Sequence, residues 1–399
     1  MEKKEKNFMK DRASTGRGVL SPEHAPKGYT LIEVLIGATI MLLVVLATLS
    51  LYVSSNKLSV DQQQFTALQH DVRSGMFFIC RDVKSIGAGI SPKFAAYFLQ
   101  GVNNDTNQSS YAYQTDRITM IGNSDPLRLI IQSYTPGTGN VTVDPADLLF
   151  YPYTTNTYPT DPLGYVNRSI LILPNPELNT INGELAQITN VDFGSGQITF
   201  NTINVTLPNG MAPGGAGGDY ADGTVHFVEF KTYWLDLDGN YPGLTAGTNG
   251  YLGLPGVMYV SQWNPLTSAY DHLALALNIE DIQFQYLGDM DNDNLLDDNN
   301  GDTAISALDF INWGDVYDWT DPVALAGIRF VRILLLGRTE NPYVSVSGTP
   351  PAQATYIYSK PAIADSPAGA QVDKHRRFLL ESTANVRNMS LNIYNAGTI

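Results

Sequence analysis

The residues best suited to chemistry are carboxylates gathered between positions 289 and 297. Asp289, Asp291 and Asp293 occupy alternate positions, and Asp297 follows four residues later. Calcium binds six to eight hard oxygen atoms, and a D-x-D-x-D loop can wrap three carboxylates around one ion while a nearby backbone carbonyl adds another ligand. The spacing therefore predicts a Ca²⁺ site with these direct ligands, joined by the carbonyl of Leu295 and by Asp297, either directly or through water.

The same loop departs from the EF-hand pattern in two places. Position six is Asn294 where glycine is usual, and position twelve is Asn300, so the bidentate glutamate is missing. Asp298 or Asp302 could take the place of that glutamate. No helical pattern flanks the loop, so the prediction is a loop site, and the competing interpretation is a solvated acidic hairpin without a metal.

Patterns typical of enzymes and of nucleic-acid binding are missing from the sequence. The five histidines are scattered without two-histidine metal spacing, and neither a G-x-S-x-G frame nor a P-loop is present. A net charge of −15 argues against a surface that binds phosphate backbones. We therefore expect a chain that is not an enzyme and does not bind nucleic acid.

A membrane anchor is predicted near the N-terminus. Residues 34–53 form twenty consecutive positions without a charge, long enough to cross a bilayer as a helix. A buried core helix would seldom be apolar on every face over this length, and a secretory signal peptide has a shorter apolar core followed by a small-residue cleavage site. Glu33 lies at the edge of the span, where a carboxylate is costly unless it meets a cation, so we interpret it as functional.

The residues that precede this segment indicate which kind of membrane anchor it is. Residues 1–28 hold seven Lys or Arg against four acids, a cytoplasmic retention signal, and residues 27–34 read KGYTLIEV. This stretch resembles the processing motif of type IV prepilins, with Tyr29 where phenylalanine is usual. The resemblance implies cleavage by a prepilin peptidase between Gly28 and Tyr29, N-methylation of Tyr29, and a role for Glu33 in subunit assembly, in which it neutralises that amine in its own or a neighbouring subunit.

The elements that must carry these groups can also be predicted. Beyond the apolar run, one helical face remains apolar, and Gly87-Ala88-Gly89 followed by Pro92 ends the pattern. We expect a helix over 29–88 and an exported β-rich domain over 89–399, an α+β fold with a long pilin-like helix packed on antiparallel sheet. Strands are predicted at 117–121, 127–131, 197–200, 224–230, 282–286 and 328–336. Whether the strands form one sheet or two subdomains is left open.

Further segments resemble PilW-type minor pilins. They lie at 65–87, 230–236, 278–293, 327–338 and 376–388. The resemblance implies a minor pilin that helps to assemble or prime a type IV pilus, with other pilins as partners. Such a protein resides in the bacterial inner membrane with its domain in the periplasm, and then in the pilus at the cell surface. The alternatives are a type II secretion pseudopilin and a pilus-tip adhesin or calcium-binding surface module, in which the unmatched residues 95–225 contact a surface.

Overall fold

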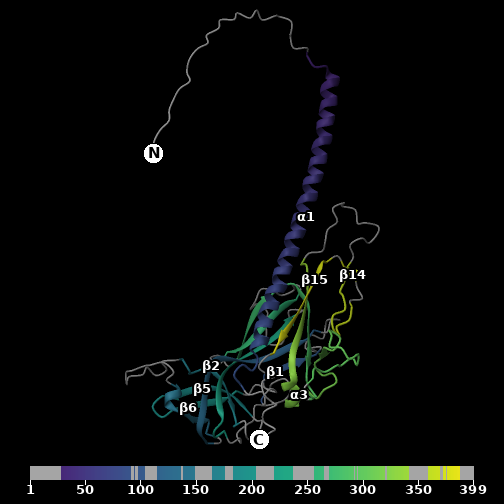
Figure 1. Ribbon diagram of the computed structural model, residues 1–399. Coiled ribbons are helices and arrows are strands. Elements are labelled where there is room, and N and C mark those ends of the chain that lie inside the picture. Colours follow the sequence, from purple (N-terminus) through teal and green to yellow (C-terminus); the bar gives the residue numbers. More distant parts are fainter. Residues whose placement is uncertain are drawn as a thin grey trace, which may run out of the picture. The chain divides into compact units, whose positions relative to one another are not determined.

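The computed structural model describes most of the chain after the predicted leader (Figure 1). The described residues are 28–90, 94, 98–103, 115–135, 138–148, 164–175, 183–203, 220–236, 256–264, 269–291, 293, 295–319, 321–340, 358–368, 372–373 and 375–386. Predictions that fall elsewhere, including residues 1–27 of the leader, lie outside this set. The chain divides into two compact units, Met1–Leu58 and Ser59–Ile399, which are described separately.

One long helix opens the described chain. The helix α1 covers Leu31–Ser85, within three residues of the predicted bounds at each end. It ends where Gly87 and Gly89 adopt positive φ angles of 63° and 73°, a backbone conformation open to glycine. The ring of Phe98 also lies so close to Gly87 that a Cβ atom there would meet it at 2.7 Å. The predicted glycine stop is therefore both conformational and steric.

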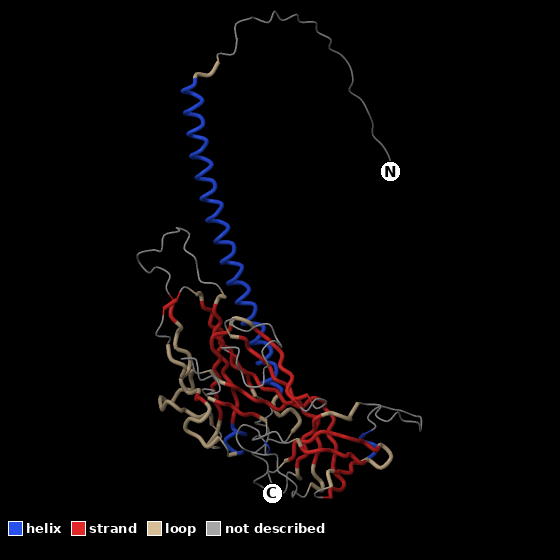
Figure 2. Tube along the Cα trace, turned by 180° about the vertical axis from the view of Figure 1, so that it is seen from behind, coloured by secondary structure: helices blue, strands red, loops and turns tan. Residues whose placement is uncertain are grey.

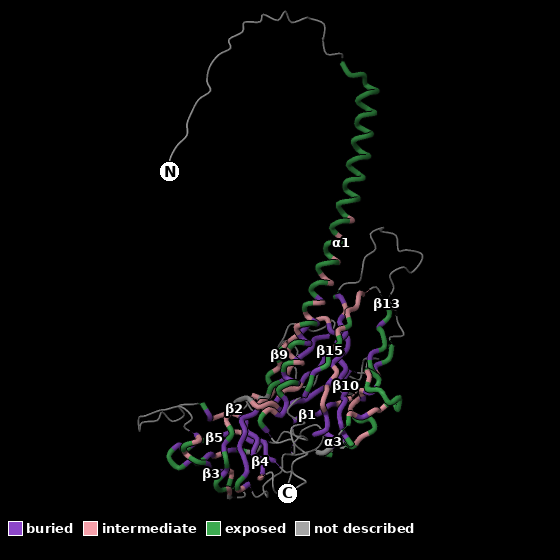
Figure 3. The backbone as a smooth tube through the Cα atoms, viewed as in Figure 1, coloured by how far each residue is buried: buried purple, intermediate pink, exposed green. Residues whose placement is uncertain are grey.

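The two parts of α1 differ in burial (Figure 3). In the first unit, apolar side chains from Leu31 to Val53 are exposed on all faces. In the second unit, the predicted apolar stripe is buried at Leu68, Val72, Met76, Ile79, Val83 and Ile86, and Phe65 packs against the same core. The change follows the sequence, because only the second part has a polar face to leave in solvent.

Strands dominate the described chain after α1 (Figure 2). The larger sheet has the order β1-β2-β3-β6-β5-β4-β7-β8-β9, with an additional pairing between β2 and β7. Its strands are β1 Leu99–Val102, β2 Arg117–Thr135, β3 Asn140–Val143, β4 Ser169–Leu173, β5 Glu184–Asp192, β6 Gln197–Thr202, β7 Thr224–Asp236, β8 Val257–Asn264 and β9 Ala269–Ala276. All of these pairings are antiparallel.

A smaller sheet of four strands has the order β11-β10-β12-β15. Its strands are β10 Ile279–Gly288, β11 Ile311–Asn312, β12 Ile328–Arg338 and β15 Arg377–Asn385. The remaining elements are the two-stranded pair β13 Tyr358–Ser359 and β14 Val372–Asp373, and two short helices, α2 Pro145–Leu148 and α3 Pro322–Gly327. The fold is α+β, a long helix on antiparallel sheet, as the sequence predicted.

The extra pairing of β2 with β7 closes part of the larger sheet on itself. Because β2 pairs with both β3 and β7, the strands β2, β3, β6, β5, β4 and β7 form a closed ring. A separate apolar core, which includes Ile131, Ile170, Ile198 and Phe227, fills this part of the fold. In Figure 1 the ring strands β2, β5 and β6 lie to one side of β15. The sequence did not show whether the strands form one sheet or two subdomains. In the structure, part of the larger sheet forms a small closed barrel with its own core.

Two predicted strands are in fact one. The predicted strands at 117–121 and 127–131 are the two ends of β2, which runs through both with a register shift between Asn123 and Arg128. The N-terminal end contributes Ile118 and Met120 to the core under α1, whereas the C-terminal end contributes Leu129 and Ile131 to the barrel. The prediction separated them because the alternation of side chains is interrupted at the shift.

The main core joins α1 to both sheets. Gly337 on β12 leaves room for Leu68 and Val72, since a Cβ atom there would lie 2.6 Å from each side chain. Tyr233 on β7 donates a hydrogen bond of 2.7 Å to the buried Asp82 of α1. Residues 59–85 of α1 are therefore an integral layer of the folded domain.

Candidate functional site

The N-terminal end of α1 is closed by a reciprocal pair of side chains. The N–H and hydroxyl of Thr30 donate to Glu33 Oε2 at 2.9 and 3.0 Å, and the Glu33 N–H donates to Thr30 Oγ1 at 3.3 Å. This is a capping box, in which a threonine and a glutamate three residues later satisfy free helix donors. It places the Glu33 carboxylate against the backbone N–H of Thr30, the residue that follows Tyr29.

The predicted processing site precedes this cap. Gly28 and Tyr29 are exposed, with the tyrosine at 85%. A Cβ atom built on Gly28 meets nothing within 4 Å. A larger residue at position 28 therefore fits without steric cost, so the structure itself does not require glycine there.

The helix that follows is built for an apolar environment. An eighteen-residue window of α1 has a mean hydropathy of 2.6, long and apolar enough to cross a membrane. The hydroxyls of Thr39 and Thr48 donate back to the carbonyls of Leu35 and Val44 at 2.8 and 2.7 Å. Since lipid offers no hydrogen-bond partners, this internal pairing removes the cost of both polar groups. Exposed apolar side chains and satisfied hydroxyls are what a single-pass anchor needs.

The acidic loop begins where β10 ends, and backbone contacts hold its two ends together. Asp289 N–H donates to the Gly327 carbonyl at 3.0 Å, and Asp297 N–H donates to the Gly288 carbonyl at 2.8 Å. A Cβ atom on Gly288 would lie 2.2 Å from the backbone carbonyl oxygen of Gly327. A Cβ atom on Gly327 would lie 2.0 Å from the backbone carbonyl oxygen of Asp289. Only glycine permits this approach of the loop to the residue before β12.

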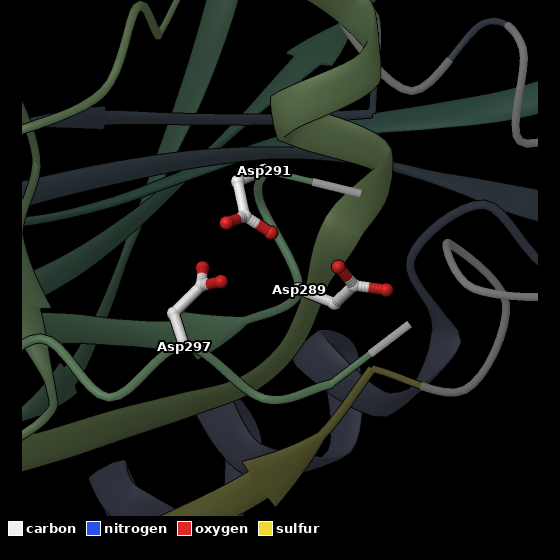
Figure 4. A group of neighbouring side chains, drawn as sticks. All are labelled: Asp289, Asp291 and Asp297. Carbon is white, nitrogen blue, oxygen red and sulfur yellow. The ribbon is translucent and has the colours of Figure 1, made fainter. Parts of the chain in front are cut away.

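Three of the predicted ligands meet in space. Asp289, Asp291 and Asp297 each offer a carboxylate oxygen within 4.8 Å of the others. Figure 4 shows the carboxylates of Asp291 and Asp297 turned toward each other, whereas the side chain of Asp289 extends away from that pair. Asp289 and Asp297 are buried and Asp291 is exposed, so one side of the group faces solvent. A cation could enter from that side.

The electrostatics of this group favour a bound cation. Burial raises the pKa of Asp297, and the nearby charges of Asp291 and Asp289 raise it further, against hydrogen bonds that lower it. Arg329 Nη2 lies 3.8 Å from Asp289 Oδ2 and supplies a partial counter-charge. Converging carboxylate oxygens are hard donors of the kind that Ca²⁺ takes as ligands.

The other predicted ligands have different surroundings. Asp293 lies outside the converging group. Its N–H donates to Asp289 and Asp291 at 3.0 and 3.2 Å, and its own carboxylate accepts the Leu295 N–H at 2.8 Å. The Leu295 side chain is exposed, and ligation by its carbonyl stays a prediction. Asn294 lies outside the described residues.

The two substitutes considered for the missing glutamate form turns instead. Asp298 accepts hydrogen bonds from the N–H groups of Gly301, Asp302 and Thr303. Asp302 accepts from the Ala304 N–H and the Asn300 side chain. Neither carboxylate belongs to the converging group of Asp289, Asp291 and Asp297.

Sequence reasoning missed two supports of these sites. Thr30 forms the capping box with Glu33, and the T-x-x-E spacing before an apolar run was a readable signal. Gly288 and Gly327, thirty-nine residues apart, let the loop close, and no local pattern pairs them. Comparison of the whole chain with known proteins finds no matching family model, no matching curated protein and no matching solved structure.

Proposed function

We propose that this protein is a filament subunit of the type IV pilin class, a PilW-like minor pilin that takes part in assembling or priming a pilus. The observation that carries the proposal is the form of α1. Its first part begins at Leu31, with Glu33 in the first turn, and exposes apolar side chains all round, while its second part belongs to the core of the domain. Such a helix can leave the lipid and pack among like helices without unfolding the domain.

The proposal gives Glu33 and the residues before it distinct roles. A prepilin peptidase at the inner membrane cuts between Gly28 and Tyr29, and the new amine is methylated. Glu33, whose carboxylate already reaches the Thr30 N–H at 2.9 Å, then neutralises the amine of Tyr29 in the same or an adjacent subunit. The domain faces the periplasm before assembly and becomes part of the pilus surface afterwards.

Mass spectrometry of the mature protein tests the processing step. Membranes and sheared filaments should contain a chain that begins at Tyr29 with a methylated amine. Replacing Gly28 with valine should leave the full-length chain uncut, and because a Cβ atom there meets nothing within 4 Å, this loss reports recognition rather than misfolding. A leader retained in wild-type filaments would contradict the proposal.

A second pair of variants separates assembly from helix capping. Both Glu33→Gln and Thr30→Ala weaken the capping box, since the two residues bond to each other. Only Glu33→Gln removes the negative charge that neutralises an amine. We expect Glu33→Gln to be depleted from filaments and Thr30→Ala to be incorporated. Equal depletion of both would mean that Glu33 acts only as a cap.

The type II secretion pseudopilin remains the alternative within this class, because the same helix serves both machines. Deleting the pilus assembly platform and, separately, the secretion platform of the host distinguishes them by which deletion leaves the protein unassembled. We favour the pilus because segments at both ends of the domain resemble PilW-type minor pilins.

Cation binding is a second proposed activity, carried by a different observation. Three carboxylate oxygens converge within 4.8 Å beside an open face, and Ca²⁺ is the cation that this ligand chemistry favours. On this proposal the domain is also a calcium-dependent surface module, and the closed barrel with its own core is the part available to contact a surface. Calorimetric titration of a chain from Ser59 to the C-terminus with CaCl₂ tests it, and an absence of binding heat and of any stabilisation would remove it.

A further inference from the structure

The exposed face of the second part of α1 has an unusual composition for this chain. Thr66, His70, Arg73, Phe77, Arg81 and Lys84 are exposed and follow one another at intervals of four, three, four, four and three residues. These intervals place them along one side of the helix, away from the buried stripe. We call this set the basic face. It carries cations around an aromatic ring on a protein whose net charge is −15.

The acids of the same helical segment are less exposed than the members of the basic face. Asp61 pairs with Arg376 at 3.0 Å. Asp82 is buried, lies 3.2 Å from Lys231 and accepts a hydrogen bond of 2.8 Å from Arg81 of the basic face. Asp71 is half-buried, 3.7 Å from His70. Among the exposed residues of α1 from 62 to 85, all of which the structure describes, none is acidic. Along this segment cationic side chains are therefore exposed, whereas the carboxylates are buried or half-buried and contact basic side chains.

The centre of the basic face is apolar. Phe77 is 63% exposed, and its ring packs edge-on against Phe78 with centroids 5.7 Å apart. A surface hollow lies beside it, lined by residues that include Thr66, Arg73, Ser74 and Phe77. Aromatic residues and arginine are the types enriched where proteins bind one another, and an aromatic side chain that enters a partner's pocket often supplies much of the affinity.

We propose that the basic face is a docking surface for an acidic face of a neighbouring subunit in the same filament. Carboxylates on that neighbour pair with Arg73, and a shallow apolar site accepts the ring of Phe77. This inference rests on the proposed function and deepens it by naming the surface and the chemistry of the partner.

Two considerations support an acidic subunit as the occupant. The basic face is complementary in charge to acidic protein surfaces, and this chain itself displays how acidic such an exterior can be. It also lies on the same helix as the exposed apolar part proposed to pack in the filament. A contact there therefore extends the subunit interface that the proposed function already requires.

Site-specific photo-cross-linking tests the proposal in cells that make filaments. A benzophenone amino acid replaces Phe77 in one variant and Leu273 of β9, which is 62% exposed, in a control variant. We expect position 77 to give an adduct with another pilin subunit, mapped by mass spectrometry to a peptide rich in Asp or Glu. The proposal would be overturned by an adduct to lipid or by an adduct to a second copy through a non-acidic peptide. It would also be overturned if position 77 gave no adduct with any subunit.

A charge-reversal variant measures the same contact without a probe. Arg73→Glu should reduce the amount in sheared filaments, relative to the amount in membranes, by at least about tenfold. Arg128→Glu makes the same charge change at an exposed position on β2 and should leave the ratio unchanged. Resistance of each variant to trypsin checks that the domain is folded. Wild-type levels of folded Arg73→Glu in filaments would refute the docking surface alone, whereas absence of the wild-type protein from filaments would refute the proposed function beneath it.

Discussion

Replacing Asp297 with asparagine should change the stability of the domain in opposite directions with and without calcium. The carboxylates of Asp297, Asp291 and Asp289 come within 4.8 Å of one another. Two unit charges at that separation repel by about 1 kcal/mol in water and by about 3.5 kcal/mol at an effective dielectric constant near 20. Asp291 is exposed and Arg329 offsets part of the Asp289 charge, so the lower part of this range applies.

Without a cation, Asp297→Asn should therefore raise the free energy of unfolding by about 1–2 kcal/mol. The asparagine keeps an oxygen that can accept the Met290 N–H, now bonded to Asp297 Oδ2 at 2.8 Å. With calcium at a hundred times the dissociation constant, the wild-type domain should gain about 2.7 kcal/mol, and the variant should gain much less. The order of stability of the two proteins then reverses on adding calcium.

Urea unfolding of a chain from Ser59 to the C-terminus, with chelator or with CaCl₂, measures both values. Tryptophan fluorescence is a suitable signal, because the ring centroids of Trp313 and Trp319 lie 4.5 Å apart in the same region. Tyr317, which contacts Asp297, packs against the same core. Asp298→Asn is the matched control in the same loop. Its carboxylate accepts backbone N–H groups, so its replacement should destabilise the domain equally in both conditions.

A destabilised Asp297→Asn variant without calcium, together with no effect of calcium on the wild type, would refute the reasoning. It would mean that the charge of Asp297 strengthens its hydrogen bonds by more than the repulsion costs. The pH dependence gives a further check on the sign. Because the pKa of Asp297 is raised, the folded state binds this proton more tightly than the unfolded state, so the cation-free domain gains stability as the pH falls toward that pKa.

Three other predictions follow from the main core and the barrel. A fragment of residues 90–399 should be unfolded by circular dichroism whereas one that starts at Ser59 should fold, because the omitted part of α1 is a layer of the core; a folded 90–399 fragment would contradict this. Burial and nearby Arg128 lower the pKa of His226 to about 4, so the domain should lose about 3 kcal/mol as the pH falls from 6.5 to 4, since the unfolded state binds this proton first. Urea titrations at several pH values should show a smaller loss for His226→Gln, and an unchanged loss would exclude this histidine as its source. Asp281→Ala should cost about 3–5 kcal/mol in the same assay, because Lys360 lies 2.7 Å from Asp281 with both side chains at 0% exposure; Asp281→Leu combined with Lys360→Met should cost less.

The long helix could be predicted almost completely because its determinants are local. Apolar residues over 34–53, the stripe that follows and the glycines at 87 and 89 each act within a few residues of their own position. The helical period alone decides which of these side chains share a face. The acidic spacing from 289 was readable as a supply of closely spaced carboxylates, and Asp289 and Asp291 of this series do belong to the converging group.

Long-range contacts decided the rest. Closure of the barrel needs β2 to meet β7, about one hundred residues further along the chain, and the joining of two predicted strands into β2 depends on that pairing. Asp297, and not Asp293, converges with Asp289 and Asp291. Two hydrogen bonds hold Asp297 there, one from its N–H to the Gly288 carbonyl and one from the Met290 N–H to its carboxylate. The close approach of Gly327 to the start of the loop fixes that end of the loop. Sequence by itself therefore determined the anchor helix and the kinds of groups available. Only the tertiary structure decided which of those groups meet, because the partners that place them are distant in the chain and no local period connects them.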